Sequence, residues 1–487
     1  MTDAQAAERR KWFALALLAS TQFVIILDAA IVNVAIPSIG RDLQFSEEDL
    51  TWIPNAYALT FGGFLLLGGR MADLLGRRRL FMIGLVLFSV ASLLGGLSTT
   101  ETQLIAARAL QGLGAALIAP AALSMVTNTF AEGAERNKAL GVWGAVSGSG
   151  GAAGVLLGGI LTEYAGWEWV LWVNVPIGIV AAILAPRLLV ESRRDSDLRH
   201  FDALGAITVT AGLSLLVFAL VDTINEGWGS TQTLTLLAIS AALIATFVFI
   251  ELRSRDPLMP FAIFRLRTLT GANIVGLLVG AALFAMFFFL SRYMQEVLGY
   301  SALKAGLSYL PLALAIIASA GMASVLVTKL GFKKVLIAGL VLVTLALLWF
   351  GQVPVNGSYV SDLLGPMVVA AIGLGLAFVP VTIAAVSGVS KDESGLASGL
   401  INTSQQIGGA LGLAVLGTIA SSKTTDLIAT AQGAPAAVPA ALTEGFQLAF
   451  MTGAGFAVIG IVATLLLVRS EDSRAVVGAS PAELPMA

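Results

Sequence analysis

The sequence contains no cysteine and only one histidine, His200, among its 487 residues. The absence of cysteine excludes disulfides, thiolate metal sites and cysteine nucleophiles. Charged residues are also scarce, since they make up 12% of the chain, against roughly a quarter in a soluble globular protein. The net charge is −2 and no block of like charges occurs, so the chain lacks the basic surface that nucleic-acid binding requires. These shortages exclude an ordinary soluble protein and a nucleic-acid-binding protein.

Apolar residues are abundant instead, at 57% of the chain with a mean hydropathy of +0.89. They recur in runs of about 20 residues, the length that crosses the hydrocarbon core of a bilayer. The first run follows Arg9-Arg10-Lys11, but it is about 24 residues long, whereas the apolar part of a signal peptide has about 7–15. We therefore predict a retained transmembrane helix there. The fourteen predicted helices lie at 13–36, 52–69, 80–98, 103–126, 138–162, 169–188, 203–221, 231–250, 269–291, 303–328, 335–351, 363–389, 396–421 and 447–468.

The basic residues predict the orientation of these helices. All but five of the 28 Lys and Arg residues fall on the side of the N-terminus. The exceptions are Arg41, Arg292, Lys304 and Lys423 on the other side, and Arg108 inside a helix. By the positive-inside rule, both termini are predicted to be cytoplasmic. The sequence thus predicts an all-α, multi-pass protein of the cytoplasmic (inner or plasma) membrane.

A short internal repeat predicts the domain organisation. The segment from Gly76 to Leu85 aligns with that from Gly331 to Leu340, and each lies at a basic turn between two predicted helices. Such an offset is typical of transporters built from parallel repeats. We predict an N-terminal six-helix bundle (1–190), an inserted helix pair with its linkers (191–268), and a C-terminal six-helix bundle with a short cytoplasmic tail (269–487).

Two ionisable residues, Asp28 and Arg108, fall well inside predicted helices. A charge near the bilayer centre costs several kcal/mol, so such residues usually face a bundle interior and serve transport. Arg108 shares a helix face with Gln111 and Gly112, a face on which polar and small residues allow a close approach. Asp28 is the candidate proton carrier, because an apolar cavity disfavours its charged form while an approaching cation restores it. A purely structural Asp–Arg pair is the alternative.

The segment from Gly69 to Arg79 is a second candidate site. Its simplest reading is a loop that fixes topology by its positive charge. A further hypothesis is a conformational latch, in which Asp73 pairs with an Arg or a helix N-terminus in only one conformation. The residues assigned to this latch are Gly69, Asp73, Gly76, Arg77 and Arg78.

Glycines at three- to four-residue spacing indicate close helix packing, and the run comprises Gly150, Gly154, Gly158 and Gly159. Passive helix packing is the leading explanation of these glycines, and a functional motif is the alternative. The helix near 396–421 is also rich in glycine but carries three carboxamides. We assign a substrate cavity to Asn33, Gln111, Asn402, Gln405, Gln406 and Phe287, although a lipid-facing stripe also accounts for the aromatic cluster around Phe287.

Catalysis and ATP hydrolysis find no support in the sequence. No P-loop occurs. Only one carboxylate lies well inside a predicted helix, the chain has no cysteine, and its one histidine lies in a loop, so the sequence contains no set of residues that could catalyse a reaction within the membrane. We therefore expect no enzymatic activity, no metal and no cofactor. An ion gradient is the expected source of energy.

Several of these segments together resemble the major facilitator superfamily, and within it the fourteen-helix drug:proton antiporters. The resemblance spans nearly the whole chain and rests on five segments: Leu27 to Pro37, Gly69 to Phe81, Arg108 to Gly114, Gly150 to Gly159, and Trp167 to Gly178. In that family the arginine at the position of Arg108 is associated with proton coupling, and the glycine segment is the antiporter motif. The sequence departs from the family pattern with Val155 in place of a proline, with Leu74 in place of an arginine, and with Glu168 where arginine is common.

The resemblance implies proton-coupled efflux of small hydrophobic or cationic compounds, such as drugs and antibiotics, by alternating access. An uptake symporter or facilitator of the same fold is the alternative. The expected partners are a small-molecule substrate, protons and the lipid bilayer, with no nucleic acid and no obligate protein partner.

Overall fold

The computed structural model of the chain describes residues 3–45, 47–50, 52–192, 202–254, 257–432 and 434–475, and these residues form helices and connecting turns without a strand. Thirteen helices of this described part are long and apolar enough to span a membrane. The fourteenth predicted helix is present as α16 (Ser394–Thr430), but its polar residues keep it out of that set. The prediction of an all-helical, multi-pass membrane protein is therefore confirmed, whereas the count of fourteen spans stays a prediction.

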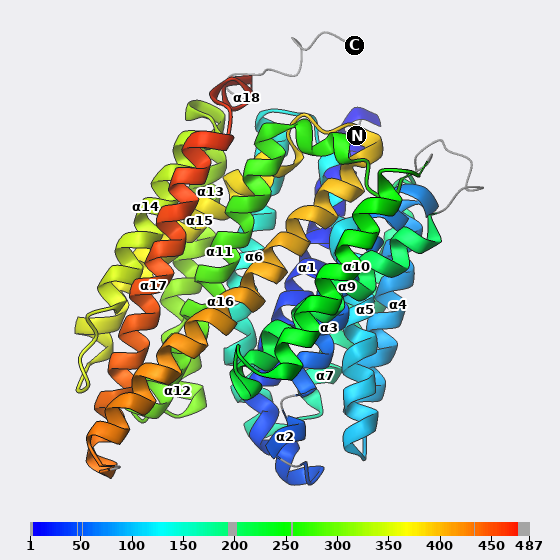
Figure 1. Cartoon of the computed structure of the whole chain (residues 1–487). Coiled ribbons are helices and arrows are strands. Elements are labelled where there is room, and N and C mark those ends of the chain that lie inside the picture. Colours follow the sequence, from blue (N-terminus) through cyan, green and yellow to red (C-terminus); the bar gives the residue numbers. More distant parts are fainter. Residues whose placement is uncertain are drawn as a thin grey trace.

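The N-terminal third forms one bundle, shown in blue to cyan in Figure 1. The helix α1 packs closely along α6, and both α3 and α4 pack on α5. The short helix α2 (Glu47–Leu50) lies in the connection after α1. The long helices are α1 (Asp3–Asp42), α3 (Trp52–Leu75), α4 (Arg77–Gly96), α5 (Glu101–Thr129), α6 (Ala134–Tyr164) and α7 with α8 (Trp169–Trp172 and Asn174–Leu188).

The C-terminal part forms a second bundle, shown in green to red in Figure 1. In it α11 packs on α16 and α17, and α15 packs on α13 and α14. Its helices are α11 (Arg267–Arg292), α12 (Ala302–Ser308), α13 (Leu310–Leu330), α14 (Phe332–Phe350), α15 (Leu364–Val386), α16, α17 (Val438–Leu467) and the short α18 (Ser470–Ala475).

Between the bundles in sequence lie α9 (Ala203–Glu226) and α10 (Thr231–Glu251). In space α9 and α10 pack on each other, and α9 also packs on α3 of the first bundle and, less extensively, on α16 of the second. The helix α1 begins and α17 ends at one end of the molecule, the upper end in Figure 1. We call it the terminal end, and the opposite one the distal end.

Most helices extend beyond their apolar runs, because polar residues at a membrane surface continue a helix without lowering its stability. The span predicted at 52–69 continues to Leu75 and so includes Asp73. The spans predicted as single helices at 169–188 and 303–328 are each interrupted, at Val173 and at Tyr309. Both breaks precede a proline, Pro176 or Pro311, which lacks the N–H that would bond back to the preceding turn.

Some predicted features fall on residues that the structure does not describe. His200, most of the linker between α8 and α9, and the end of the C-terminal tail lie outside the described residues.

Candidate functional site

The first candidate site is a buried ion pair in the middle of the first bundle. Arg108 Nη1 of α5 donates to Asp28 Oδ2 of α1 at 2.6 Å, and the two side chains are 1% and 0% exposed. Arg108 Nε also donates to the carbonyl oxygen of Ile53 at 3.3 Å, and the guanidinium lies 4.5 Å from the centre of the Tyr57 ring. The pair therefore joins α1, α3 and α5 at one point of the bundle interior.

Carboxamides complete the hydrogen bonding of Asp28. Its Oδ1 accepts from Asn174 Nδ2 at 2.7 Å and from Gln111 Nε2 at 3.2 Å. Both amides also donate to Ser92 Oγ of α4, and Arg108 donates to Gln111 Oε1 at 2.8 Å. The carboxylate thus accepts three hydrogen bonds, one of them from a cation, which compensates for the loss of its hydration.

The sequence identified only part of this network. Asp28, Arg108 and Gln111 were assigned to function, whereas Ser92, Tyr57 and the role of Asn174 were missed. A usable signal existed for Asn174, because it stands two residues before Pro176 at the break between α7 and α8. Serine and tyrosine are too common in membrane helices to be identified by type alone.

Glycines of α6 hold α1 against this network. A Cβ atom added at Gly154 would lie 2.7 Å from the Leu27 carbonyl oxygen, and one at Gly158 would lie 2.8 Å from that of Ile31. Gly150 similarly faces Ile26. The glycine stripe therefore packs on the turns of α1 that carry Asp28. It divides at its end, however, because Gly159 faces the Leu303 backbone in the second bundle.

The helix α6 runs without interruption through Val155, from Ala134 to Tyr164. Without a proline there, no backbone hydrogen bond of α6 is lost at that position.

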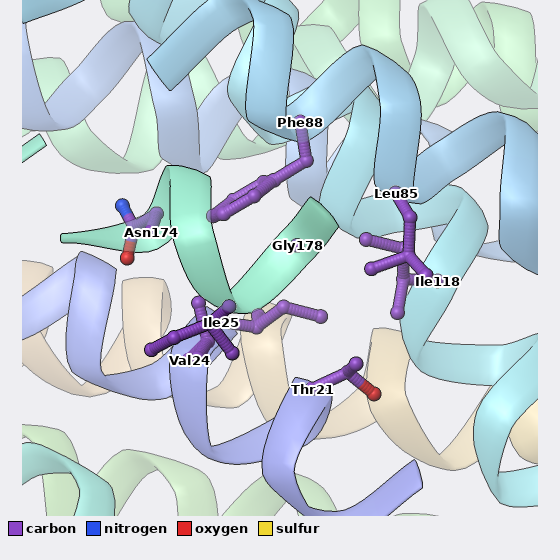
Figure 2. Close-up of a pocket in the computed structure, with 9 residues that line it drawn as sticks. Thr21, Val24, Ile25, Leu85, Phe88, Ile118, Asn174 and Gly178 are labelled. Carbon is purple, nitrogen blue, oxygen red and sulfur yellow. The ribbon is translucent and has the colours of Figure 1, made fainter. Parts of the chain in front are cut away.

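A small cavity lies beside the network, between α1, α4, α5 and α8, and Figure 2 shows its lining. The amide of Asn174 and the hydroxyl of Thr21 point away from its centre. The side chains that face it are thus mainly apolar, and an apolar void of this kind stays dry. We interpret it as a packing gap and not as a ligand site. It is lined by Thr21, Val24, Ile25, Leu85, Phe88, Ile118, Asn174, Ile177 and Gly178.

The second candidate site is a contact between the bundles at the terminal end. Asp73 at the end of α3 is fully buried, and its two oxygens accept from the backbone N–H groups of Gly395 and Leu396, both at 2.9 Å. These groups belong to the first turn of α16, where unpaired N–H groups and the helix dipole favour an anion. Asp73 thus binds the N-terminus of a helix in the opposite bundle.

Arg77 completes this contact. Its Nη2 donates to Asp73 Oδ1 and to the carbonyl oxygen of Lys391, both at 2.6 Å. Gly69 allows the close approach of α3 to α16, because an added Cβ would lie 2.5 Å from the Gly395 carbonyl oxygen. All of these atoms lie between the two bundles, so the contact depends on how the bundles are placed.

The remaining residues of the predicted latch bind within the first bundle. Gly76 has a φ of 106°, in the region that favours glycine. The turn that it makes allows Glu191 to accept from the backbone N–H groups of Arg78 and Arg79, both at 3.0 Å. Gly76 and Arg78 therefore stabilise the start of α4, and the described partners of Arg78, Glu191 and Leu189, belong to the first bundle and the segment that follows it.

The predicted cavity residues do not form one cluster. Gln111 is part of the Asp28 network and is fully buried. Asn33 is exposed and donates to the Ala29 carbonyl of its own helix. Phe287 stacks on Tyr309 with ring centres 5.4 Å apart. The side chains of Gln405 and Gln406 are partly exposed and have no hydrogen-bond partner among the described residues.

Comparison with known proteins agrees with this architecture. The sequence profile of the Major Facilitator Superfamily matches residues 18–413. The chain is 42% identical over 416 residues to the cephamycin export protein CmcT of Amycolatopsis lactamdurans, which covers 85% of each chain. It is 36% identical over 474 residues to the puromycin resistance protein of Streptomyces alboniger, with 97% of this chain and 94% of that protein covered.

Solved structures show the same fold at low sequence identity. The human organic anion transporter MFSD10 superimposes with a TM-score of 0.64 at 16% identity, over 95% of this chain and 100% of that one. The proton:xylose symporter XylE superimposes with a TM-score of 0.64 at 14% identity, over 94% of this chain and 96% of that one.

Proposed function

Because the chain belongs to the major facilitator superfamily, whose members transport small molecules, we propose that it exports drugs or antibiotics in exchange for protons. Export is supported by its relatives, which include export and resistance proteins for cephamycin and puromycin. The observation that carries proton coupling is the buried pair of Asp28 and Arg108. A carboxylate without access to water, held by one cation, is suited to bind a proton when that cation moves away.

The proposed cycle assigns separate roles to the two sites. When Asp28 takes up a proton, its attraction to Arg108 is lost and the helices α1 and α5 are free to shift. The contact of Asp73 with the start of α16 holds the bundles together at the terminal end, and it must break before that end opens. Proton binding in the first bundle thereby favours movement between the bundles, as alternating access requires.

The topology and location belong to the same proposal. We propose that α16 is the fourteenth span, because its 37 residues are long enough to cross a bilayer at 1.5 Å per residue. Both termini are then cytoplasmic, in the plasma membrane of a bacterial cell. The proposed units are 1–190, 191–268 and 269–487, and the energy source is the proton gradient without a cofactor or an obligate protein partner.

We further propose that the inserted pair moves with the first bundle. Trp52 of α3 stacks on Phe218 of α9 with ring centres 5.5 Å apart, and Gly62 of α3 faces Val217. Arg70 also donates to the Pro257 carbonyl in the linker that follows α10, at 2.9 Å. Toward the second bundle, Trp228 Nε1, in the turn between α9 and α10, donates to Thr418 Oγ1 of α16 at 2.9 Å.

The absence of native cysteine makes this arrangement testable. A Cβ atom at Gly62 would lie 3.3 Å from Val217 Cγ2, so Gly62→Cys with Val217→Cys is expected to form a disulfide and to leave transport intact. Trp228→Cys and Thr418→Cys, joined by a bifunctional maleimide, are expected to stop transport, because they tie α9 to the second bundle. Transport that survives the second cross-link but not the first would overturn the assignment.

The function itself is tested with purified protein in proteoliposomes. Puromycin accumulation under an imposed pH gradient, measured with and without a protonophore, reports both direction and coupling. Asp28→Asn is expected to abolish gradient-driven transport, whereas Asp362→Asn, at a partly exposed site of the distal end, should not. Undiminished proton-driven transport by Asp28→Asn would refute the assigned role.

A further inference from the structure

The interior of the described bundles carries a specific charge pattern. Asp28 and Arg108 are the only Asp, Glu, Lys or Arg residues near the middle of a long described helix, since every other described one lies toward an end of a long helix, in a short helix or in a connection. With Asp28 charged, the pair has no net charge. With Asp28 protonated, as the proposed function requires, the pair has a net charge of +1. The interior is therefore neutral or positive in both states and never negative.

This pattern disfavours a cationic ligand. A cation in a medium of low dielectric needs a nearby negative charge to replace its hydration. Asp28 does not supply one, because its oxygens already accept from Arg108, Gln111 and Asn174. The sequence alone suggested that a proton and a cationic substrate compete for Asp28. In this conformation, however, both oxygens of Asp28 already accept hydrogen bonds, which leaves no open position at which a cationic substrate could bind.

Uncharged hydrogen-bonding groups are available instead on α16. Asn402 and Gln406 are four residues apart and so lie on one face of the helix. Ser398, one turn before Asn402 on the same face, has a buried hydroxyl without a partner in the described part of the chain. The amide nitrogen of Asn402 donates to the Ser398 carbonyl at 2.7 Å, which leaves its oxygen available. Gln405 and Gln406 form no hydrogen bond with described residues and are partly exposed.

The position of this polar face relates it to the latch. It begins one turn after Gly395, whose N–H binds Asp73, and Gly399 on the same helix contacts the backbone of α3. Further along, Gly409 faces the Phe284 ring of α11. Along α16, the carboxamides thus lie between the segment that contacts the first bundle and the segment that packs against the Phe284 ring of α11. An amphiphilic ligand requires this combination of apolar surface and a few convergent polar groups.

We propose that the polar face of α16, formed by Ser398, Asn402, Gln405 and Gln406, binds the hydrogen-bonding part of an uncharged amphiphilic substrate. This inference rests on the proposed efflux function and names its substrate class. Carboxamides both donate and accept hydrogen bonds, so they suit carbonyl, hydroxyl and amide groups. They do not compensate a fixed charge.

Two matched probes test this substrate class. They share one fluorescent polycyclic aromatic body, and one carries a neutral carboxamide where the other carries a trimethylammonium group. Binding to the full-length protein in lipid nanodiscs is measured by fluorescence polarisation. The wild-type chain is expected to bind the carboxamide probe at least about tenfold more tightly, which corresponds to about 1.4 kcal/mol. Equal or tighter binding of the ammonium probe would overturn the inference.

Variants of Gln406 connect the preference to α16. Gln406→Leu is expected to weaken binding of the carboxamide probe about tenfold, and Gln406→Glu to strengthen binding of the ammonium probe by a similar factor. Gln352→Leu is the matched control, because Gln352 is exposed beyond the end of α14 and its side chain, among the described residues, bonds only to the Leu348 carbonyl of α14. Unchanged affinity in Gln406→Leu would contradict the assigned site. Asn402→Leu replaces it if thermal unfolding shows that Gln406→Leu is misfolded.

Cellular export separates this inference from the proposed function. A wild-type chain that exports only the ammonium probe overturns the uncharged substrate class and leaves efflux standing. A wild-type chain that exports neither probe nor puromycin from expressing cells contradicts the efflux function itself. Export of the carboxamide probe alone supports both.

Discussion

The two bundles share an architecture but differ in where they carry charge. At the terminal end Asp73, three residues before Gly76, binds the start of α16 in the opposite bundle. Three residues before Gly331 the second bundle has Thr328, whose hydroxyl accepts from Asn137 of α6 at 3.0 Å. Equivalent positions of the repeat therefore make equivalent contacts across the bundles, one with a carboxylate and the other with neutral groups.

The helix that starts after each turn shows the same contrast. Gly76 and Gly331 both have a positive φ, of 106° and 82°. A carboxylate, Glu191, binds the N–H groups at the start of α4, whereas a hydroxyl, that of Ser473, binds the Lys333 N–H at the start of α14. Charged hydrogen bonds are roughly twice as strong as neutral ones. The first bundle thus holds its contacts more strongly, and it also contains the buried ion pair.

The largest expected effect comes from breaking that ion pair. Arg108→Met leaves the charge of Asp28 buried without a cation, so we expect a loss of about 3–5 kcal/mol in the free energy of unfolding. The double variant Arg108→Met with Asp28→Leu is expected to recover most of that stability without recovering proton-driven transport. Thermal unfolding and transport in proteoliposomes give the two readouts. Recovery of both would make the pair purely structural.

The next effect concerns the charged contact between the bundles. Asp73→Asn weakens the bonds to α16 and leaves the charge of Arg77 less compensated, so turnover is expected to fall several-fold while substrate affinity changes little. Initial rates and equilibrium binding are measured on the same sample. A tenfold loss of affinity, about 1.4 kcal/mol, with unchanged turnover would show that Asp73 acts on binding and not on conformation.

The neutral counterpart predicts a smaller effect. Thr328→Val keeps the shape of the side chain but removes the acceptor of Asn137, at a cost of about 1 kcal/mol. Turnover is expected to change less than in Asp73→Asn. The matched control is Thr452→Val, because Thr452 is partly exposed and, among the described residues, its hydroxyl bonds only to the Leu448 carbonyl of its own helix. An effect as large as that of Asp73→Asn would show that charge does not distinguish the two contacts.

The sequence predicted the charged side of this comparison better than the neutral side. Asp28 and Arg108 were identified because a charge inside an apolar helix is rare, and Asp73 because it lies beside the arginines of the turn between two predicted helices. Asn137 and Thr328 gave no such signal, since polar uncharged residues are common near the ends of membrane helices. Their pairing depends on how two distant helices pack, which no local pattern encodes.

Hydropathy predicted where the long helices lie, but it did not predict where some of them are interrupted. Apolar runs predicted every long helix that the structure describes, because each must satisfy its backbone within the bilayer. The breaks at Val173 and Tyr309 lie inside continuous apolar runs, where hydropathy gives no signal and only the following prolines do. The placement of α9 against both bundles was likewise missed, since a lateral contact leaves no trace in hydropathy.

The smallest effect is expected at the distal end, where Trp228 of the inserted pair bonds to Thr418 of α16. Trp228→Phe keeps an aromatic ring but removes the indole N–H. The hydroxyl of Thr418 stays satisfied, because it also donates to the Ala414 carbonyl at 2.8 Å, so we expect a loss of at most about 1 kcal/mol in stability. If the inserted pair moves with the first bundle, this bond breaks in every cycle, and its loss should leave turnover equal or slightly higher. Initial rates of Trp228→Phe and Thr418→Val should then agree, whereas a marked decrease in both would mean that α9 must stay bound to the second bundle during transport.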